Sequence, residues 1–185
     1  MLMTCLNRDD TDIDEVIADI EKHFKLKVEE NLKDYLSCEI RFNEEMKVTR
    51  IGQPHLIQKL QEKFKEETKD KGSFGTPRTP SFRIIRLSEL VDYVSKEEQS
   101  KYRTGVGMLL FLVKHTRPDI ANCTRELSKV LDKATVSAYK EMIRIIKFIL
   151  DTSDYRLRFQ PKPSIHNKWH LMIYTDRDYA GDKET

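Results

Sequence analysis

Aspartates at the end of one predicted strand are the residues of this sequence best suited to metal chemistry. Alternating side chains predict a strand over 169–175, and Asp176 and Asp178 follow it directly. Carboxylate oxygens are the ligands that Mg²⁺ prefers, but this ion gives up its water reluctantly and one carboxylate does not hold it. Asp9 and Asp10 form a second acidic pair, which the residue preferences of helix caps explain without a metal.

Basic residues on two predicted helices are suited to binding phosphates. The pattern over 135–152 predicts a helix whose apolar face is formed by Ala138, Met142, Ile145, Ile146 and Ile149. A second predicted helix runs from Pro118 to Leu131. The candidate phosphate contacts on or beside these two helices are Arg117, Arg125, Lys129, Lys140, Arg144 and Lys147. The last three fall opposite the apolar face at 100° per residue, as a helix lying along a phosphate backbone requires, although a merely solvated face gives the same pattern.

The composition is that of a polar, soluble chain with an uneven distribution of charge. The 185 residues are 38% hydrophobic and 35% charged, and the net charge is +2. Residues 1–52 carry 8 Lys/Arg against 13 Asp/Glu, whereas residues 53–185 carry 25 against 18. An acidic amino-terminal part followed by a basic remainder fits a nucleic-acid partner, but many solvated surfaces show this distribution of charge. Three scattered cysteines argue against a disulfide framework and a zinc site, and no run of about 18 apolar residues predicts a membrane span.

Two helices and a hairpin are predicted in the first third of the chain. Apolar residues at helical spacing over 12–24 predict an amphipathic helix. Alternation over 36–42 and again over 46–51 predicts a β-hairpin with a short turn. Pro54 suits the first turn of a further helix, whose apolar stripe ends at Phe64.

A linker and a long helix are predicted next. Prolines, glycines and a charge run over 67–95 predict a linker with some order around 82–90. The pattern over 96–115 predicts a helix that contains Gly105 and Gly107. Because this Gly-x-Gly does not follow a strand and a turn, we interpret it as a site of close helix packing and not as a phosphate loop.

Several stretches of the sequence resemble the copia-type reverse transcriptases of long-terminal-repeat retrotransposons. Residues 1–4 resemble the strand that follows a Tyr-Val-Asp-Asp turn in this family. The other matching stretches are 23–27, 32–36, 102–112, 116–120, 126–128, 143–152 and 174–182, in the family's order. The first two of these lead into the family's hairpin, and the last resembles the opening of its ribonuclease H domain.

The resemblance implies an α+β fold with a palm remnant, a mostly helical thumb and connection, and a terminal β-strand that opens a truncated ribonuclease H-like domain. The divisions that it implies are 1–52 for the end of the palm with a primer-grip-like hairpin, 53–66 for the start of the thumb, 67–95 for a linker, 96–153 for the helical thumb and connection, and 154–185 for the start of ribonuclease H.

The resemblance also implies chemistry with two Mg²⁺ ions in the full-length family. The aspartates that hold the metal ions for DNA polymerisation would lie before Met1, so we expect this chain alone to be inactive as a polymerase. Asp176 resembles the first ribonuclease H carboxylate, whereas Asp178 and Asp182 are better explained as turn residues. Because that site needs about four acids, we expect a metal at Asp176 to be weakly bound or absent.

The expected function is therefore that of a reverse transcriptase segment that holds the template–primer. We expect weak, non-specific binding of an RNA–DNA or DNA duplex, with the remainder of a polyprotein as a further partner, no membrane, and an intracellular, particle-associated location. Three or four phosphate contacts give a slope of log K against log salt of about −3 to −4. A stand-alone nucleic-acid-binding module and a protein-interaction module without catalysis remain the alternatives.

Overall fold

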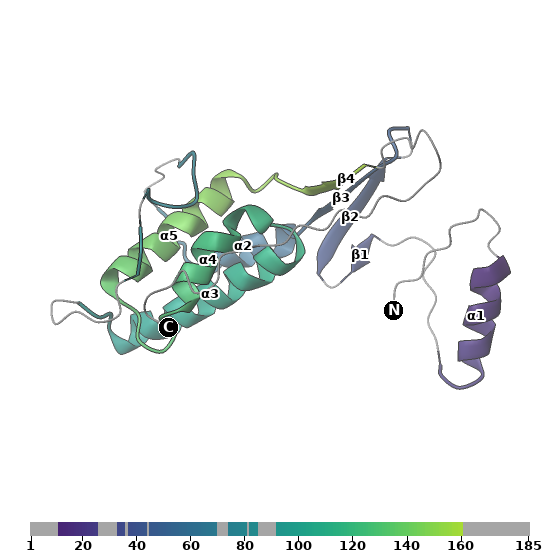
Figure 1. Ribbon diagram of the computed structural model, residues 1–185, viewed down its shortest axis with the longest axis horizontal. Helices are drawn as coiled ribbons and strands as arrows, with labels where there is room; N and C mark the ends of the chain where they lie inside the picture. The colour runs from purple at the N-terminus through teal and green to yellow at the C-terminus, as the bar shows by residue number, and fades with distance from the viewer. Residues whose placement is uncertain are drawn as a thin grey trace, which may run out of the picture.

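The protein is an α+β structure in which a group of helices adjoins a small antiparallel sheet (Figure 1). A computed structural model describes residues 11–25, 33–35, 37–43, 45–69, 74–80, 82–84 and 92–160. The helices are α1 (Thr11–Glu21), α2 (Pro54–Lys63), α3 (Lys96–His115), a short 3₁₀ turn η1 (Pro118–Ile120), α4 (Ala121–Ser128) and α5 (Val136–Asp151). The strands are β1 (Asp34–Tyr35), β2 (Cys38–Asn43), β3 (Val48–Gly52) and β4 (Leu157–Phe159). The predicted α+β class is confirmed.

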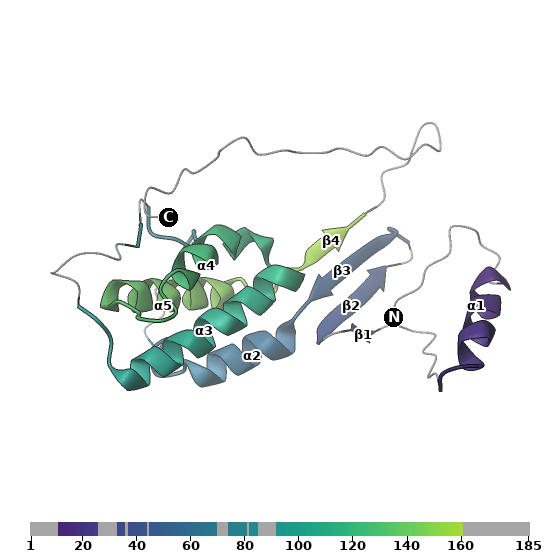
Figure 2. The same cartoon turned by 60° about the horizontal axis from the view of Figure 1, so that its bottom comes forward.

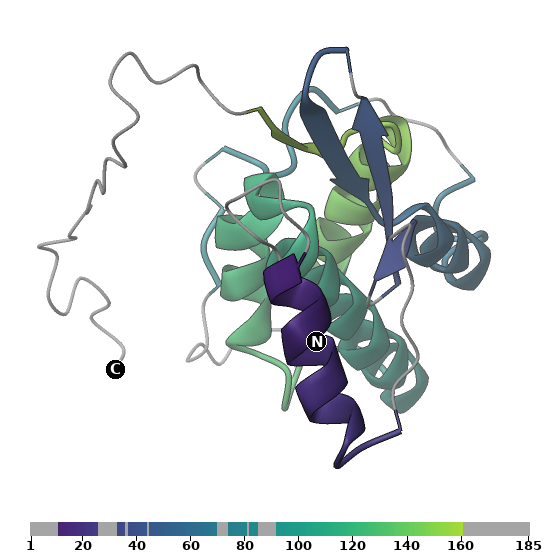
Figure 3. The ribbon, with the colours of Figure 1, turned by 90° about the vertical axis from the view of Figure 1, so that its right-hand side faces the viewer.

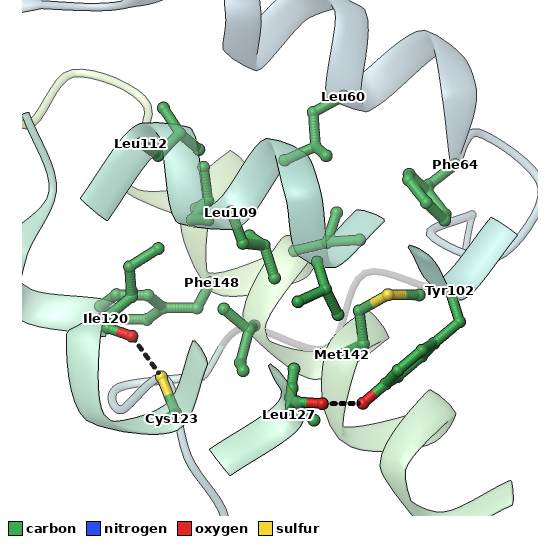
Figure 4. Close-up of a cluster of buried hydrophobic side chains, with 14 of the residues drawn as sticks. Leu60, Phe64, Tyr102, Leu109, Leu112, Ile120, Cys123, Leu127, Met142 and Phe148 are labelled. Atoms are coloured by element: carbon green, nitrogen blue, oxygen red, sulfur yellow. Dashed lines mark hydrogen bonds between the residues drawn. The ribbon is translucent and has the colours of Figure 1, made fainter. Parts of the chain in front are cut away.

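Helices α2 to α5 pack around one hydrophobic core (Figures 2 and 4). All five residues of the apolar face predicted for α5 are fully buried in it. Tyr102 of α3 is also fully buried, and its hydroxyl donates a hydrogen bond to the Leu127 carbonyl at 2.7 Å. Burial raises the pKa of this phenol, so Tyr102 stays a neutral donor that ties α3 to α4.

Local signals in the sequence fix where the helices begin. Ser95 precedes α3 and forms a capping box with Glu98, because each side chain bonds the backbone N–H of the other residue. Thr135 caps α5 through a hydrogen bond from the Ala138 N–H at 3.1 Å. Pro54 stands at the start of α2, as predicted.

The predicted hairpin is confirmed as β2 and β3, and the sheet adds two strands to it. The strand order is β1-β2-β3-β4, with every neighbouring pair antiparallel. In the β2–β3 turn, Asn43 accepts a hydrogen bond from the Met46 N–H at 2.8 Å, and Lys47 takes a positive φ of 48°. This turn fixes the register of the hairpin.

Strand β4 comes from the part of the chain expected to open a ribonuclease H-like domain at 154–185. It pairs with β3 through Thr49↔Phe159, Arg50↔Arg158 and Ile51↔Leu157. The chain therefore returns from α5 to the sheet that it left before α2. The domain boundary at 153/154 stays a prediction, and the sheet continues across it.

Part of the predicted linker is bound to α5. Glu141, only 5% exposed, accepts hydrogen bonds from the Thr79 N–H at 2.7 Å and from the Thr79 hydroxyl at 2.8 Å. Phe82 and Ile84 pack against the core. Thr79 thus ties the predicted linker to α5, since the buried Glu141 carboxylate needs these donors.

Helix α1 forms where the sequence predicted it, but its apolar stripe is not buried. Val16 is 46% exposed and Phe24 is 68% exposed. Figure 3, which views the molecule from the side of α1, shows this helix in front of the sheet and of the other helices. No helix of the described ranges combines the length and apolar character that crossing a membrane requires.

Candidate nucleic-acid interface

Arg117, a predicted phosphate contact, is a buried structural residue. It is 2% exposed, and its guanidinium donates hydrogen bonds to both carboxylate oxygens of Asp119, at 2.9, 3.0 and 3.3 Å. It also donates to the Thr152 carbonyl at 3.2 Å and hydroxyl at 2.8 Å, at the end of α5. The ring of Phe148 lies 5.6 Å from the guanidinium carbon. Since burial keeps this side chain from solvent, we assign it to the fold and base no phosphate contact on it.

The basic stripe predicted on α5 lies opposite the core, but its three side chains differ in environment. Lys140 is exposed and Lys147 is half-buried. Arg144 is half-buried and stacks on Phe74, whose ring centroid lies 4.1 Å from the guanidinium carbon. One of its nitrogens also lies 3.4 Å from the Thr76 carbonyl. Arg144 therefore holds the 74–80 segment on α5, and Lys140 is the exposed side chain of the stripe.

The two basic side chains predicted on and beside α4 lie nearer to solvent than Arg117. Arg125 is exposed. Lys129 is half-buried and forms an ion pair of 3.1 Å with Glu126. Asp176, the predicted metal ligand, lies outside the described residues. Within the described ranges, no three His, Cys, Asp or Glu side chains are grouped as metal ligands.

The two glycines of α3 lie in opposite environments. A methyl group added at Gly105 would lie 2.5 Å from the Met142 sulfur and 2.9 Å from the Phe64 ring, so close packing explains this glycine. At Gly107, which is exposed, a methyl group would meet no atom of the described residues within 4 Å outside its own stretch of helix. The interpretation of the Gly-x-Gly as a packing site is therefore confirmed for Gly105 and wrong for Gly107, which faces solvent.

Gly107 lies at the centre of an exposed stripe on α3. Arg103 precedes it by one turn and Phe111 follows it by one turn, and both side chains are exposed. Arg103 is oriented by a hydrogen bond from its Nε to the Leu131 carbonyl at 2.8 Å. The Phe111 ring packs on His115, with 4.3 Å between the ring centroids. Sequence reasoning missed this stripe, although a glycine in the middle of a strong helical pattern was the available signal.

A row of arginines on the sheet was also missed by sequence reasoning. Arg50 of β3 is directly opposite Arg41 of β2 and Arg158 of β4. All three side chains are exposed. Because directly opposite residues in neighbouring strands project from the same face, the three arginines form one row. Arg41 and Arg50 belong to one hairpin, but Arg158 joins them only through the pairing of β4 with β3, which no local signal marks.

Comparison with known proteins gives partial matches to curated proteins. No family model matches the chain, and no solved structure matches it significantly. Secreted RxLR effector protein 161 of Plasmopara viticola is 29% identical over 84 residues, which are 45% of this chain and 56% of that protein. The retrovirus-related Pol polyprotein from transposon TNT 1-94 of Nicotiana tabacum is 26% identical over 145 residues, or 74% of this chain. The corresponding polyprotein from transposon RE1 of Arabidopsis thaliana is 30% identical over 109 residues, or 59% of this chain.

The matched regions are small parts of these polyproteins. The chain spans 56% of the effector protein, 10% of the TNT 1-94 polyprotein and 7% of the RE1 polyprotein. The two polyprotein matches cover more of this chain than the effector match does. The chain is therefore similar in sequence to short parts of retrotransposon Pol polyproteins.

Proposed function

We propose that the chain is the template–primer-holding part of a retrotransposon reverse transcriptase, and that it binds a nucleic-acid duplex without sequence preference. In this proposal the β2–β3 hairpin belongs to the palm, α2 to α5 belong to the thumb and connection, and β4 belongs to the start of the ribonuclease H-like part. Mg²⁺ and Asp176 belong to the ribonuclease H part of the full-length family. The observation that carries the proposal is the exposed stripe of α3 centred on Gly107.

A solvent-facing glycine inside a helix lowers the stability of the folded protein, so its presence there indicates a role other than folding. It costs about 1 kcal/mol relative to alanine, and no contact within the described residues explains Gly107. The lack of a side chain lets another molecule approach the helix backbone closely. Arg103 and Phe111, one turn away on either side, offer a charge and an apolar ring to the same molecule.

The wide, shallow minor groove of an A-form duplex is a surface that such a helix face fits. A phosphate backbone on either side of that groove would meet basic residues on the neighbouring helices. The proposed contacts are the exposed Arg125 and Lys140, with the half-buried Lys129 and Lys147 beside them. Arg117 is buried and is not among them, and Arg144 packs on Phe74. A helix face with one aromatic residue and no set of base-reading side chains favours binding without sequence preference.

Replacing Gly107 with glutamine is expected to weaken binding of an RNA–DNA hybrid by tenfold or more while leaving the protein folded. The glutamine side chain occupies the space through which the duplex approaches α3, and it suits a helix better than glycine does. The measurement is fluorescence anisotropy with a labelled hybrid over a series of salt concentrations. The slope of log K against log salt is expected to stay constant, because no charge is lost.

The matched control is Ala18→Gln, which adds the same side chain to an exposed position of α1. This variant is expected to bind as the wild type does. Equal binding by the Gly107 variant and the wild type would contradict the role of the α3 stripe. If the wild type does not bind the hybrid at 50 mM salt, the proposed function itself is wrong, and a protein-interaction role takes its place.

Replacing Lys140 and Lys147 together with glutamine is expected to flatten the salt dependence. Each phosphate contact that is lost lowers the slope by about 0.9, so the change should be about 1 to 2. Arg144 is left in place because it holds the 74–80 segment. Helical circular dichroism should not change, since both lysines lie opposite the buried face of α5. An unchanged slope would show that this face is only solvated.

A further inference from the structure

We propose that Arg41, Arg50 and Arg158 form a second phosphate-binding site, on one face of the sheet. The inference rests on the proposed function for the nature of the polyanion, which is the phosphodiester backbone of a duplex. The site lies on the sheet formed by β1 to β4, beside the group of helices that includes α3, α4 and α5 (Figure 1). It would therefore extend the contact with a duplex beyond the helices.

The register of three strands brings the arginines together. Arg41 is opposite Arg50 in the β2–β3 pair, and Arg50 is opposite Arg158 in the β3–β4 pair. Neighbouring strands lie about 4.8 Å apart, so the three arginines follow one another across about 10 Å of the sheet. Like charges directly opposite one another destabilise a sheet. A bound anion would remove this repulsion.

The middle arginine lacks a partner among the described residues. Arg41 donates a hydrogen bond to Glu39 at 2.7 Å, and Arg158 donates one to Gln160 at 2.7 Å. The Arg50 side chain makes no hydrogen bond or ion pair within the described ranges. Its guanidinium therefore has donors available for a ligand, flanked by two arginines that are each oriented by a side chain of their own strand.

Glu39 is the one carboxylate of β2, β3 and β4, and it does not neutralise the face. It is directly opposite Gly52, and the Arg156 side chain lies over this glycine, 2.1 Å from where a β-carbon would stand. The hydrogen bond from Arg41 lowers the pKa of Glu39, as do the charges of Arg41, Arg156 and His55. Asp34 of β1 is directly opposite Glu39 in the register, so two carboxylates stand against four arginines and leave a net charge of +2 on this face.

The opposite face of the same strands is apolar and cannot serve an anion. Ile40, Ile51 and Leu157 form one row of directly opposite residues, and Phe42 and Phe159 flank Thr49 in the next. The charge is therefore confined to one face. Guanidinium groups match the geometry of phosphate oxygens with paired donors. A continuous row of guanidinium groups matches the repeated phosphates of a nucleic-acid backbone. It makes no contact that distinguishes one base from another.

The test is the salt dependence of hybrid binding by the variant Arg41→Gln, Arg50→Gln, Arg158→Gln. Each lost contact lowers the slope of log K against log salt by about 0.9, so the triple variant should lower it by about 2 to 3. The single variant Arg50→Gln should lower it by about 1. Removing like charges that face one another should not destabilise the sheet, so urea unfolding of both variants is expected to match or exceed the wild type.

The matched control is Lys59→Gln, Lys63→Gln, Lys65→Gln, which removes the same charge from exposed positions on and just after α2. Its slope should stay within about 1 of the wild type. The inference would be overturned if the control and the triple variant changed the slope equally, or if neither arginine variant changed it. Neither result would contradict the proposed function, provided that the wild type binds the hybrid. Failure of the wild type to bind the hybrid would overturn both. If the triple variant does not fold, the Arg50 variant alone decides.

Discussion

Replacing Gly105 with alanine is expected to lower the free energy of unfolding by about 1 to 3 kcal/mol, the range for overfilling a packed core. The added methyl group would lie 2.5 Å from the Met142 sulfur and 2.9 Å from the Phe64 ring. Both of these side chains are fully buried, so neither can move away without disturbing other core residues. Figure 4 shows Phe64 and Met142 beside α3 within this core.

The same substitution at Gly107 is expected to have the opposite sign. Outside its own stretch of helix, the methyl group meets no atom of the described residues within 4 Å, and alanine in an exposed helix interior is favoured over glycine by about 1 kcal/mol. Urea unfolding followed by circular dichroism measures both variants, with the midpoint compared at an unchanged slope. A stable Gly105 variant would show that Met142 moves freely, and a destabilised Gly107 variant would show that α3 is covered at this point. Either result would contradict the contrast between the two glycines.

Replacing Arg117 with methionine is expected to lower the free energy of unfolding by about 2 to 4 kcal/mol. The substitution leaves the Thr152 carbonyl, at the end of α5, without the donor that it has at 3.2 Å. It also leaves Asp119 without its ionic partner, but the Asp119 side chain is 39% exposed and water replaces part of that interaction. Methionine preserves apolar contact with Phe148, so the decrease in the free energy of unfolding measures mainly the lost hydrogen bonds.

Arg125→Met is the matched control for Arg117, because it removes an exposed arginine from the neighbouring helix. Surface substitutions of this kind change stability by no more than about 0.5 kcal/mol. A lysine at position 117 keeps the charge but not the planar guanidinium with its paired donors, so it should recover only part of the lost free energy of unfolding. Wild-type stability of the Arg117 variant would mean that the guanidinium does not hold the end of α5.

The sequence by itself determined α1, α2, α3, α5 and the hairpin. The single helix predicted from Pro118 to Leu131 is wrong in its bounds, because the structure has the 3₁₀ turn η1 (Pro118–Ile120) followed by α4, which ends at Ser128. Helix α3 occupies Lys96–His115, the predicted range, because the Ser95 capping signal and the apolar stripe agree about where it begins and which face is buried. The same holds for α5, where Thr135 supplies the cap and all five predicted core residues are buried. Such features are local, so spacing along the chain is enough to predict them.

Tertiary structure alone decided which polar residues face solvent and which meet one another. Periodicity gave Arg117 and Lys140 the same expected role, but the fold buries the first against Asp119 and Thr152 and leaves the second exposed. Two glycines separated by one residue differ because a shift of two residues along a helix turns the side chain by about 200°. The arginine row exists only because β4 returns to pair with β3, and no local pattern encodes a pairing between strands so far apart in the chain.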